Sequence, residues 1–349
     1  MDTLAAVLTE LNRPLQLYKV SIPALRPGQV LVEVAYSGVC HSQLLEVRGK
    51  RGPDRFLPHT LGHEGSGIVA EVGPGVTKVK PGDRVVLSWI KGRGAEAGGT
   101  TYQGPEGPVN SGAISTFMRH TVTCENRITP VPVAMPLREA ALLGCAIPTG
   151  AGIVLNTAAV RPGSSVAVFG IGGIGLSAIL ASSLMNATVI IAVDLFDHKL
   201  DQARQVGATH LINARRQDPL VTILEITGRQ GVDYAIEAAG QRTTMETAFQ
   251  AVRDGGGLCV LAGNLPQGER IALNPFDLIK GKRIVGTWGG ESQPDRDIPL
   301  YANLYLSGRL NLEPLITQSN RLEEINRALD DLEAGKVGRA LIAMTEGPA

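Results

Sequence analysis

The pattern of hydrophobic and polar positions divides the chain into two parts. Residues 4–40 carry short apolar runs (LAAVL, LQLYKV, VLVEVAYSGV) separated by proline and glycine, and GSGIVAEVG and VKPGDRVVLSW continue this pattern. Short apolar runs bounded by turn residues are typical of β-strands. Further strand-like pieces follow as far as residue 132. The first part of the chain is therefore predicted to be mostly β-structure.

A glycine-rich segment interrupts these strands. KGRGAEAGGTTYQGPEGPVNSGA, residues 91–113, has little apolar content. Segments of this length without regular structure are uncommon in compact domains and tend to be functional, so we expect a long surface loop here. Further on, LREAALLGCAIPTGAGIVLN predicts one helix that ends before Pro148 and a second that begins near it, because proline interrupts a helix.

From Ser165 the pattern changes to an alternation of strands and helices. SVAVF, TVIIAVD, THLIN, VDYAIEAAG, LCVLAG and KRIVGTWGG have the composition of buried strands, and helical pieces such as HKLDQARQVGA and TMETAFQAVRDGG lie between them. This alternation predicts a doubly wound parallel sheet with both faces covered. The tail contains an amphipathic helix, RLEEINRALDDLEAG, and a strand, ALIAM, and is expected to return to the first part.

A glycine motif lies where the first strand of this alternation meets its helix. Gly170, Gly172 and Gly175 form G-x-G-x-x-G, which allows a tight turn, a close approach to a pyrophosphate and close packing of the helix on the sheet. The phosphates would lie at the helix N-terminus. Asp194 ends the next strand, where its carboxylate can bind ribose hydroxyls and repel a 2′-phosphate. The motif therefore predicts that the chain binds NAD rather than NADP. The simpler interpretation is that the glycines only form a tight turn and that Asp194 only caps a loop.

Length and composition narrow the class of protein. A chain of 349 residues indicates two domains. Lys+Arg and Asp+Glu both number 33, so neither nucleic acid nor an acidic membrane is indicated as a partner. The N-terminus lacks the pattern of a signal peptide and no apolar run is long enough to span a membrane, so we expect a cytoplasmic location. Four scattered cysteines favour metal binding or thiol chemistry over a disulfide scaffold.

Candidate metal ligands lie in the first half of the chain. Cys40 follows a strand in GVCHSQ, His63 and Glu64 belong to the turn LPHTLGHEGSG, and Cys145 lies in LLGCAIPTG. Two thiolates and one imidazole suit a zinc ion with a fourth position open to water or substrate. Since these residues are far apart in the sequence and buried cysteines often serve only as small hydrophobic residues, residue type alone leaves both interpretations open.

The motifs together resemble a known family. GVCHSQ, GHEGSGIVAEVGPGVTKVKPGDRVV, LGCAIPTGAGIVLNTA, VFGIGGIGLSAI and NPFDLIKGKRIVGTWGG, in this order, resemble the zinc-dependent alcohol dehydrogenases of the medium-chain dehydrogenase/reductase (MDR) superfamily over almost the whole chain. The resemblance implies an α/β protein with a GroES-like, mostly β catalytic domain, residues 1–146 completed by 288–349, and a Rossmann cofactor domain, residues 147–287. It also implies hydride transfer between NAD(H) and a small-molecule alcohol or its aldehyde or ketone.

The resemblance assigns roles to individual residues. Cys40, His63 and Cys145 would bind one catalytic zinc ion, with Glu64 behind it. Ser42 would hydrogen-bond the substrate oxygen and pass on its proton, and Trp89 would form a wall of the substrate pocket. The remaining positions would bind NAD: His41 and Arg339 at the pyrophosphate, Lys199 with Asp194 at the adenosine ribose, Thr149 and Ile174 near the nicotinamide, and Gly170, Gly172, Gly173 and Gly175 in the glycine turn. Relatives associate through the edge of the nucleotide sheet, so a homodimer or homotetramer is expected.

Four departures from the family pattern limit what can be transferred, and one is that the glycine-rich segment 91–113 has no obvious counterpart in the family. The segment between Trp89 and Gly112 has no cysteine, whereas many relatives carry four there that hold a structural zinc, so we expect no second zinc. Gln43 replaces an aspartate that commonly orients the zinc-bound histidine, although its amide oxygen can accept from an imidazole. Leu45 replaces a histidine that often completes the proton relay. The choice among primary alcohols, secondary alcohols, sugars and cyclitols stays open.

Two alternatives belong to different functional classes. A zinc-free quinone or enoyl reductase of the same superfamily would keep the glycine motif but normally lack the set Cys40, His63 and Cys145, which is present. A non-catalytic nucleotide-binding protein on the same fold is also compatible with the pattern, because fold does not determine function. The intact Ser42 favours the enzyme.

Overall fold

A computed structural model describes residues 1–344 of the chain. These residues divide into two compact units. The first unit contains Met1–Cys145, Gln293–Gly308 and the chain from Ile316 onward, and the second contains Ala146–Ser292 and Arg309–Leu315. The sequence placed the two boundaries after residues 146 and 287, and it did not predict that residues 309–315 pack with the second unit.

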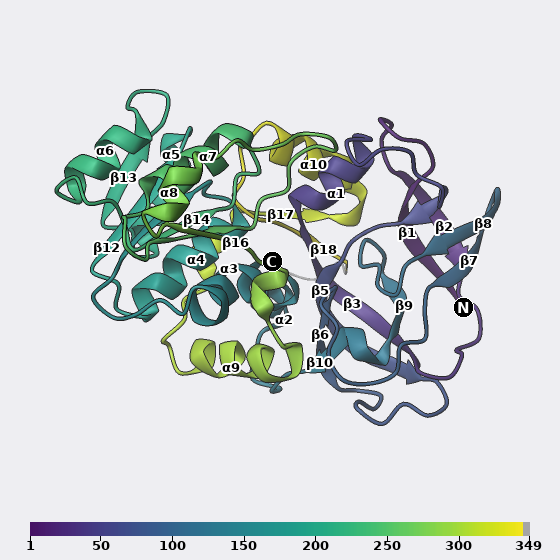
Figure 1. The fold of residues 1–349 in the computed structure, drawn as a ribbon. Coiled ribbons are helices and arrows are strands. Elements are labelled where there is room, and N and C mark those ends of the chain that lie inside the picture. Colours follow the sequence, from purple (N-terminus) through teal and green to yellow (C-terminus); the bar gives the residue numbers. More distant parts are fainter. Residues whose placement is uncertain (345–349) are drawn as a thin grey trace. The chain divides into compact units, whose positions relative to one another are not determined.

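Most of the first unit is β-structure (Figure 1). Its strands are β1 (Asp2–Leu8), β2 (Gln16–Ser21), β3 (Gln29–Val39), β4 (His59–Thr60), β5 (Glu64–Val72), β6 (Arg84–Ser88), β7 (Thr100–Gly104), β8 (Gly107–Ser111), β9 (His120–Cys124), β10 (Ile128–Pro130), β17 (Gln318–Arg321) and β18 (Ala340–Ala343). A closed barrel has the order β1, β2, β7, β8, β4. The neighbouring sheet has the order β10, β6, β5, β3, β18, β17, with β9 also paired to β3.

The helices of the first unit are α1 (His41–Val47), α2 (Leu137–Ala140), α9 (Pro294–Leu306) and α10 (Ile325–Glu333). The apolar face of α10 buries Ile325 and Leu329 in the same cluster as Leu44 and Val47 of α1. The strand that follows, β18, pairs antiparallel with β3. The C-terminal helix and strand therefore complete the first unit, as the sequence predicts.

The segment 91–113 is not the long surface loop that the sequence analysis expected. Its second half forms a hairpin of β7 and β8 in which Tyr102 pairs with Val109. Both side chains are buried, with 1% and 2% exposed, and the Tyr102 hydroxyl accepts a hydrogen bond of 2.9 Å from the backbone N–H of Val122. The hairpin closes a barrel, so its partners are distant in sequence. Because the segment is rich in glycine, its two inward-facing positions could not be recognised from the sequence.

The first half of that segment is held by two carboxylates. Glu125 accepts hydrogen bonds from the backbone N–H groups of Thr77 at 2.7 Å and Ala95 at 2.8 Å. Glu96 pairs with the ammonium group of Lys91 at 2.8 Å. Ion pairs and side-chain acceptors therefore fix this part of the chain, which has no cysteine with which to bind a metal ion.

The second unit is an alternation of strands and helices. Its elements are α3 (Ala146–Gly152), β11 (Ser165–Phe169), α4 (Gly173–Leu184), β12 (Val189–Asp194), α5 (Asp197–Gln205), β13 (His210–Asn213), α6 (Pro219–Ile226), β14 (Tyr234–Glu237), α7 (Arg242–Ala251), β15 (Leu258–Leu261), α8 (Pro275–Ile279) and β16 (Arg283–Gly286). The strands form one parallel sheet in the order β13, β12, β11, β14, β15, β16 (Figure 1).

Helices cover both faces of this sheet. Ile223 of α6 and Phe249 of α7 pack in one cluster with Phe169 of β11. Because side chains alternate along a strand, Val168 points to the opposite face, where it lies near Gly175 of α4. Burial of each large apolar side chain contributes about 1.5–3 kcal/mol. The predicted doubly wound parallel sheet is confirmed.

The helical segment 137–152 is interrupted at a different residue from the one predicted. A 3₁₀ turn, Ala141–Gly144, ends at Cys145, whose φ of −150° and ψ of −63° are not helical. Pro148 lies in the first turn of α3, where its missing N–H would have no helical partner anyway. Within residues 1–344 no single helix has the length and apolar composition of a membrane span, and one bent pair, Leu137–Gly144 with Ala146–Thr157, reaches them only in combination.

Candidate metal centre and cofactor site

The strand register of the first unit brings three predicted site residues together. β18 pairs with β3 so that Ala340 lies opposite Val39, and β5 pairs with β6 so that Glu64 lies opposite Ser88. β3 and β5 are themselves neighbours in the sheet. The residues that come directly after Val39, directly before Ala340 and directly after Ser88 are Cys40, Arg339 and Trp89.

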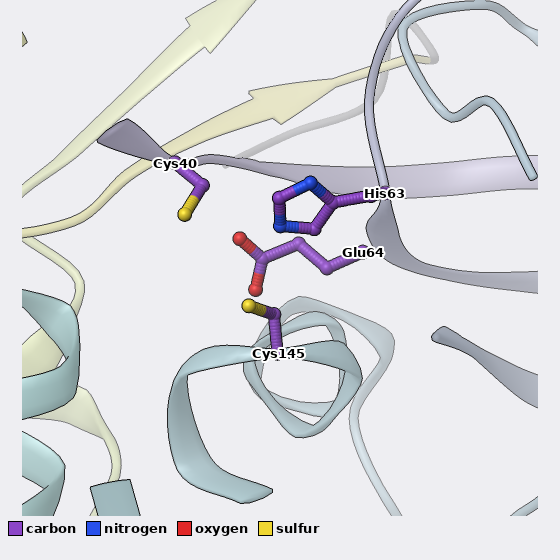
Figure 2. A group of neighbouring side chains, drawn as sticks. All are labelled: Cys40, His63, Glu64 and Cys145. Carbon is purple, nitrogen blue, oxygen red and sulfur yellow. The ribbon is translucent and has the colours of Figure 1, made fainter. Parts of the chain in front are cut away.

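Four potential metal-binding side chains meet at this place. Donor atoms of Cys40, His63, Glu64 and Cys145 all lie within 4.8 Å of one another, and Figure 2 shows them pointing toward a common space. Glycine makes this approach possible, because a Cβ at Gly38 would lie 2.5 Å from Cδ of Glu64. The structure thus brings together the side chains that the sequence analysis proposed as a metal site.

The donor set fits a zinc ion. Among the residues that the structure describes, His63 Nε2 and Glu64 Oε2 are buried without a hydrogen-bond partner. A buried polar atom without a partner costs about 1–3 kcal/mol, so such an atom is expected to have a ligand. Two sulfurs and one imidazole nitrogen are a set that zinc prefers, and three protein ligands are typical of a catalytic site.

The two thiols influence each other strongly. A hydrogen bond from the Cys145 thiol lowers the pKa of Cys40 well below its usual value, against the effect of burial, and the charge of Arg339 helps. The same hydrogen bond, with burial, raises the pKa of Cys145. The pair therefore favours one thiolate and one thiol, and metal binding has to displace the proton that remains.

A buried ion pair lies beside the thiols. The Nη2 group of Arg339 donates to Oε1 of Glu64, and its Nη1 group donates to the carbonyl of Val39 at 3.3 Å. Burial raises the pKa of Glu64, although the charge of Arg339 opposes this change. The sequence analysis assigned Arg339 to the pyrophosphate. Its guanidinium is 4% exposed and bound to Glu64, and the pyrophosphate role stays a prediction.

Gln43 is oriented differently from the sequence-based expectation. Its Oε1 accepts a hydrogen bond of 3.1 Å from the backbone N–H of Cys40, which closes a capping box on α1, and its Nε2 contacts Nδ1 of His63. The sequence analysis noted that this amide oxygen can accept from an imidazole, but here the N–H of Cys40 occupies it. A histidine that binds metal through Nε2 carries its proton on Nδ1, so metal binding requires the amide to turn round.

The predicted proton carrier lies on the same side of the imidazole. The Ser42 hydroxyl is 3.4 Å from Nδ1 of His63, which makes it a weak hydrogen-bond partner of that nitrogen. The neighbouring His41 is an exposed residue of α1. The proposed roles of Ser42 toward substrate and of His41 toward the pyrophosphate stay predictions.

The glycine turn of the second unit has room for a phosphate. Gly170 has φ of +89°, and a Cβ there would lie 2.7 Å from the backbone nitrogen of Ala239. A Cβ at Gly175 would lie 2.0 Å from the carbonyl oxygen of Gly170, whereas one at Gly172 would meet nothing within 4 Å. The first and third glycines are therefore needed for packing. The second leaves an open face at the N-terminus of α4, which fits a pyrophosphate.

Asp194 and Lys199 lie near the end of β12. The Asp194 carboxylate accepts hydrogen bonds from the backbone N–H groups of Ile171 and Leu195, both at 2.7 Å. A carboxylate has further lone pairs that remain for ribose hydroxyls. The Lys199 ammonium lies 5.3 Å from the centre of the Phe196 ring. This arrangement is compatible with the predicted ribose site.

The other predicted cofactor residues also belong to the second unit. Gly173 and Ile174 open α4 directly after the glycine turn. Thr149 of α3 is buried, and among the described residues its Oγ1 has no hydrogen-bond partner. Their contacts with NAD stay predictions.

The sequence analysis missed Glu237 at the end of β14. This side chain is fully buried, and its Oε1 accepts hydrogen bonds from the backbone N–H groups of Ala239 at 3.0 Å and Gly240 at 2.8 Å. Glu237 thus holds the turn that packs against Gly170. The available signal was an acidic residue that ends the apolar strand YAIE.

The fold and the donor set are those of a metal-dependent dehydrogenase that uses a nucleotide. The family model of the alcohol dehydrogenase GroES-like domain matches residues 26–133, and that of the zinc-binding dehydrogenase matches residues 173–304. S-(hydroxymethyl)glutathione dehydrogenase of Paracoccus denitrificans is 33% identical and aligns over 98% of this chain and 100% of its own.

Two solved structures of dehydrogenases are also similar to this chain. The alcohol dehydrogenase zinc-binding domain protein of Burkholderia ambifaria is 34% identical with a TM-score of 0.92, and benzyl alcohol dehydrogenase of Acinetobacter calcoaceticus is 32% identical with a TM-score of 0.90. Each comparison covers 99% of this chain and 100% of the other. The chain belongs to the zinc-dependent alcohol dehydrogenases of the MDR superfamily. It is a zinc-dependent oxidoreductase that interconverts an alcohol and its carbonyl compound.

Proposed function

We propose that Cys40, His63 and Cys145 bind a single zinc ion in this enzyme and that the substrate oxygen takes the fourth position. The buried Nε2 atom of His63, which lacks a partner among the described residues and has two thiols nearby, carries this proposal. A zinc ion held there would act as a Lewis acid and would lower the pKa of an alcohol bound to it. Glu64 and Arg339 lie behind the ligands as a buried ion pair of no net charge.

The chain's own residues complete the reaction. Ser42 would hold the substrate hydroxyl and carry its proton away, since a hydroxyl both donates and accepts. The amides of the glycine turn would bind the pyrophosphate of NAD, and Asp194 would bind the adenosine ribose and repel a 2′-phosphate. Support for this assignment comes from the open face at Gly172 and from the lone pairs that Asp194 retains.

We propose primary alcohols and their aldehydes as the substrate class. The names of two relatives, S-(hydroxymethyl)glutathione dehydrogenase and benzyl alcohol dehydrogenase, both describe compounds with a CH₂OH group. Trp89 provides an aromatic surface beside the ligands. Initial rates of NADH formation with benzyl alcohol, S-(hydroxymethyl)glutathione, a secondary alcohol and a sugar alcohol test this class. Faster turnover of the secondary alcohol or the sugar alcohol would contradict it.

Removal of one ligand tests the zinc site. We expect about one zinc per purified chain, because of the two groups of potential metal ligands among residues 1–344 only the one with Cys40, His63 and Cys145 contains thiols; the other, Glu46, Asp54 and His59, offers one imidazole and two carboxylates. Cys145→Ala is expected to lose both the zinc and the turnover while the protein stays folded. Cys124→Ala, which removes another buried thiol of the first unit, is the matched control and should keep both. Full activity and zinc content in Cys145→Ala would exclude Cys145 as a ligand.

We also propose that the enzyme is a homodimer or a homotetramer. β16 is the last strand in the order of the parallel sheet, so one of its edges has no neighbouring strand among the described residues. Large apolar side chains are exposed nearby: Phe276 at 57%, Ile279 at 77% and Trp288 at 79%. An exposed edge with apolar neighbours favours association with a second copy through a two-fold interface.

A further inference from the structure

Trp89 contacts two of the proposed zinc ligands. Its indole Nε1–H donates a hydrogen bond of 3.2 Å to Sγ of Cys145. Its ring also lies edge-on to the imidazole of His63, with ring centres 6.4 Å apart and an angle of 67° between the planes. A residue that merely lined a substrate pocket would not need a hydrogen-bond donor directed at a ligand sulfur.

The backbone fixes the relative positions of Trp89 and Cys145. The hydroxyl of Ser88, the residue before Trp89, donates a hydrogen bond of 2.7 Å to the carbonyl of Gly144, the residue before Cys145. A Cβ at Gly144 would lie 2.2 Å from the carbonyl oxygen of Leu87, so only glycine allows this approach. The strand end that carries Trp89 and the break that carries Cys145 are thus packed directly on each other.

A second contact fixes the backbone of Trp89. The guanidinium of Arg127 donates to the Trp89 carbonyl and also lies 3.3 Å from the carboxylate of Glu96. Both the ring and the backbone of Trp89 are therefore held by contacts that do not involve substrate.

A hydrogen bond to a ligand sulfur changes the metal ion that the sulfur binds. An indole N–H can only donate, and a hydrogen bond to an anionic acceptor is stronger than one to a neutral acceptor. The donor withdraws electron density from the thiolate, which then donates less to the ion. Hydrogen bonds to ligand sulfurs tune metal sites in this way, and an ion that receives less charge polarises its remaining ligand more strongly.

We propose that Trp89 is a positioning residue that tunes the metal ion through the sulfur of Cys145. The inference rests on the proposed function, in which Cys145 binds the ion. It assigns to the indole N–H an effect on the metal ion that is separate from the contact of the indole ring with substrate.

The test removes the N–H and keeps the ring. Site-specific incorporation of β-(3-benzothienyl)alanine at Trp89 replaces the N–H by sulfur in a ring system of nearly the same shape. Trp89→Phe, which also removes the N–H but has a smaller ring, is the second variant. Each protein is loaded with Co²⁺ in place of zinc, and the thiolate-to-cobalt charge-transfer absorption is recorded. The band should move to longer wavelength in both variants, because a sulfur without the hydrogen bond holds its electrons less tightly.

Activity and a control complete the experiment. With zinc, kcat should fall by about 10-fold in the benzothienyl protein, the lower end of the effect for residues behind a metal ligand, and KM for NAD should not change. Trp288→Phe removes the other tryptophan, an exposed residue of the second unit, and should leave the band in place.

The possible failures are distinguishable. A charge-transfer band at the same wavelength in the parent and in both Trp89 variants would overturn the inference and leave the zinc site intact. A lower kcat with an unmoved band would mean that Trp89 acts only as a pocket wall, which also overturns it. The absence of any thiolate-to-cobalt band in the parent protein would instead refute the proposed ligands.

Discussion

Gln43→Glu tests how His63, the proposed zinc-binding histidine, is oriented. In the structure the amide oxygen of Gln43 accepts from the N–H of Cys40, and the amide nitrogen faces Nδ1 of His63. A carboxylate has two accepting oxygens and no donor. Glutamate can therefore cap the helix with one oxygen and accept from the Nδ1–H of His63 with the other, which leaves Nε2 available as a metal ligand.

The expected change in zinc affinity follows from the difference between a hydrogen bond to a charged carboxylate and one to a neutral amide. A hydrogen bond to a charged group contributes about 1.5–3 kcal/mol, compared with about 0.5–1.5 kcal/mol for a neutral one. The difference of about 1.4 kcal/mol corresponds to a tenfold change in affinity. Since Gln43 is 2% exposed, desolvation of the new carboxylate offsets part of the gain, and the charge of the bound ion counteracts that penalty. We therefore expect zinc affinity to rise by about 10-fold, within the range known for residues behind metal ligands.

The assay is zinc release to a chelating dye, compared among the parent, Gln43→Glu and Gln43→Met. The glutamate variant should release zinc about 10-fold more slowly. The methionine variant, which has a similar volume but neither caps the helix nor contacts His63 through a polar atom, should release zinc faster. It should also unfold at a lower temperature, because loss of the cap costs about 1 kcal/mol. Equal release rates in all three proteins would show that Gln43 does not orient His63.

Three further predictions concern the cofactor, acid stability and assembly. Asp194→Gly should raise kcat/KM for NADP and lower it for NAD, and an unchanged ratio would assign cofactor selection to another residue. The pKa of Glu96 is lowered to about 2, chiefly by its hydrogen bond with Lys91, from 4.5. A lowered carboxyl pKa stabilises the fold above pH 4.5 and loses this effect as the pH falls toward 2, so Glu96→Gln should lower Tm at pH 7 but not near pH 2. An equal deficit at both pH values would mean that packing, not charge, is lost. Ile279→Asp should reduce the mass measured by light scattering at micromolar concentration, and an unchanged oligomer would exclude the surface beside β16 as the interface.

Local patterns allowed much of the second unit to be predicted from the sequence. Its four inner strands, β11, β12, β14 and β15, are mostly buried, so each appears as an apolar run, and the glycine turn has its own signature in Gly170, Gly172 and Gly175. The structure adds the physical reason for two of these glycines, namely the contacts of Gly170 with Ala239 and of Gly175 with Gly170. The βαβ alternation could be predicted because each of its signals lies within a few residues.

Other features depend on partners that are far apart in the sequence, and only the tertiary structure determined them. The hairpin around Tyr102 and Val109 exists because a barrel closes on it, and composition alone favoured a loop. Motif resemblance proposed Cys40 and Cys145 as ligands of one ion, but the pairing of β5 with β3 and β6, together with the packing of Gly144 against the end of β6, brings them together. The orientation of the Gln43 amide and the hydrogen bond from Trp89 to Cys145 had no sequence signal. A side chain's hydrogen-bond partner is set by which other donors and acceptors the fold places within about 3 Å of it, and that distance is a property of the packed chain rather than of any segment.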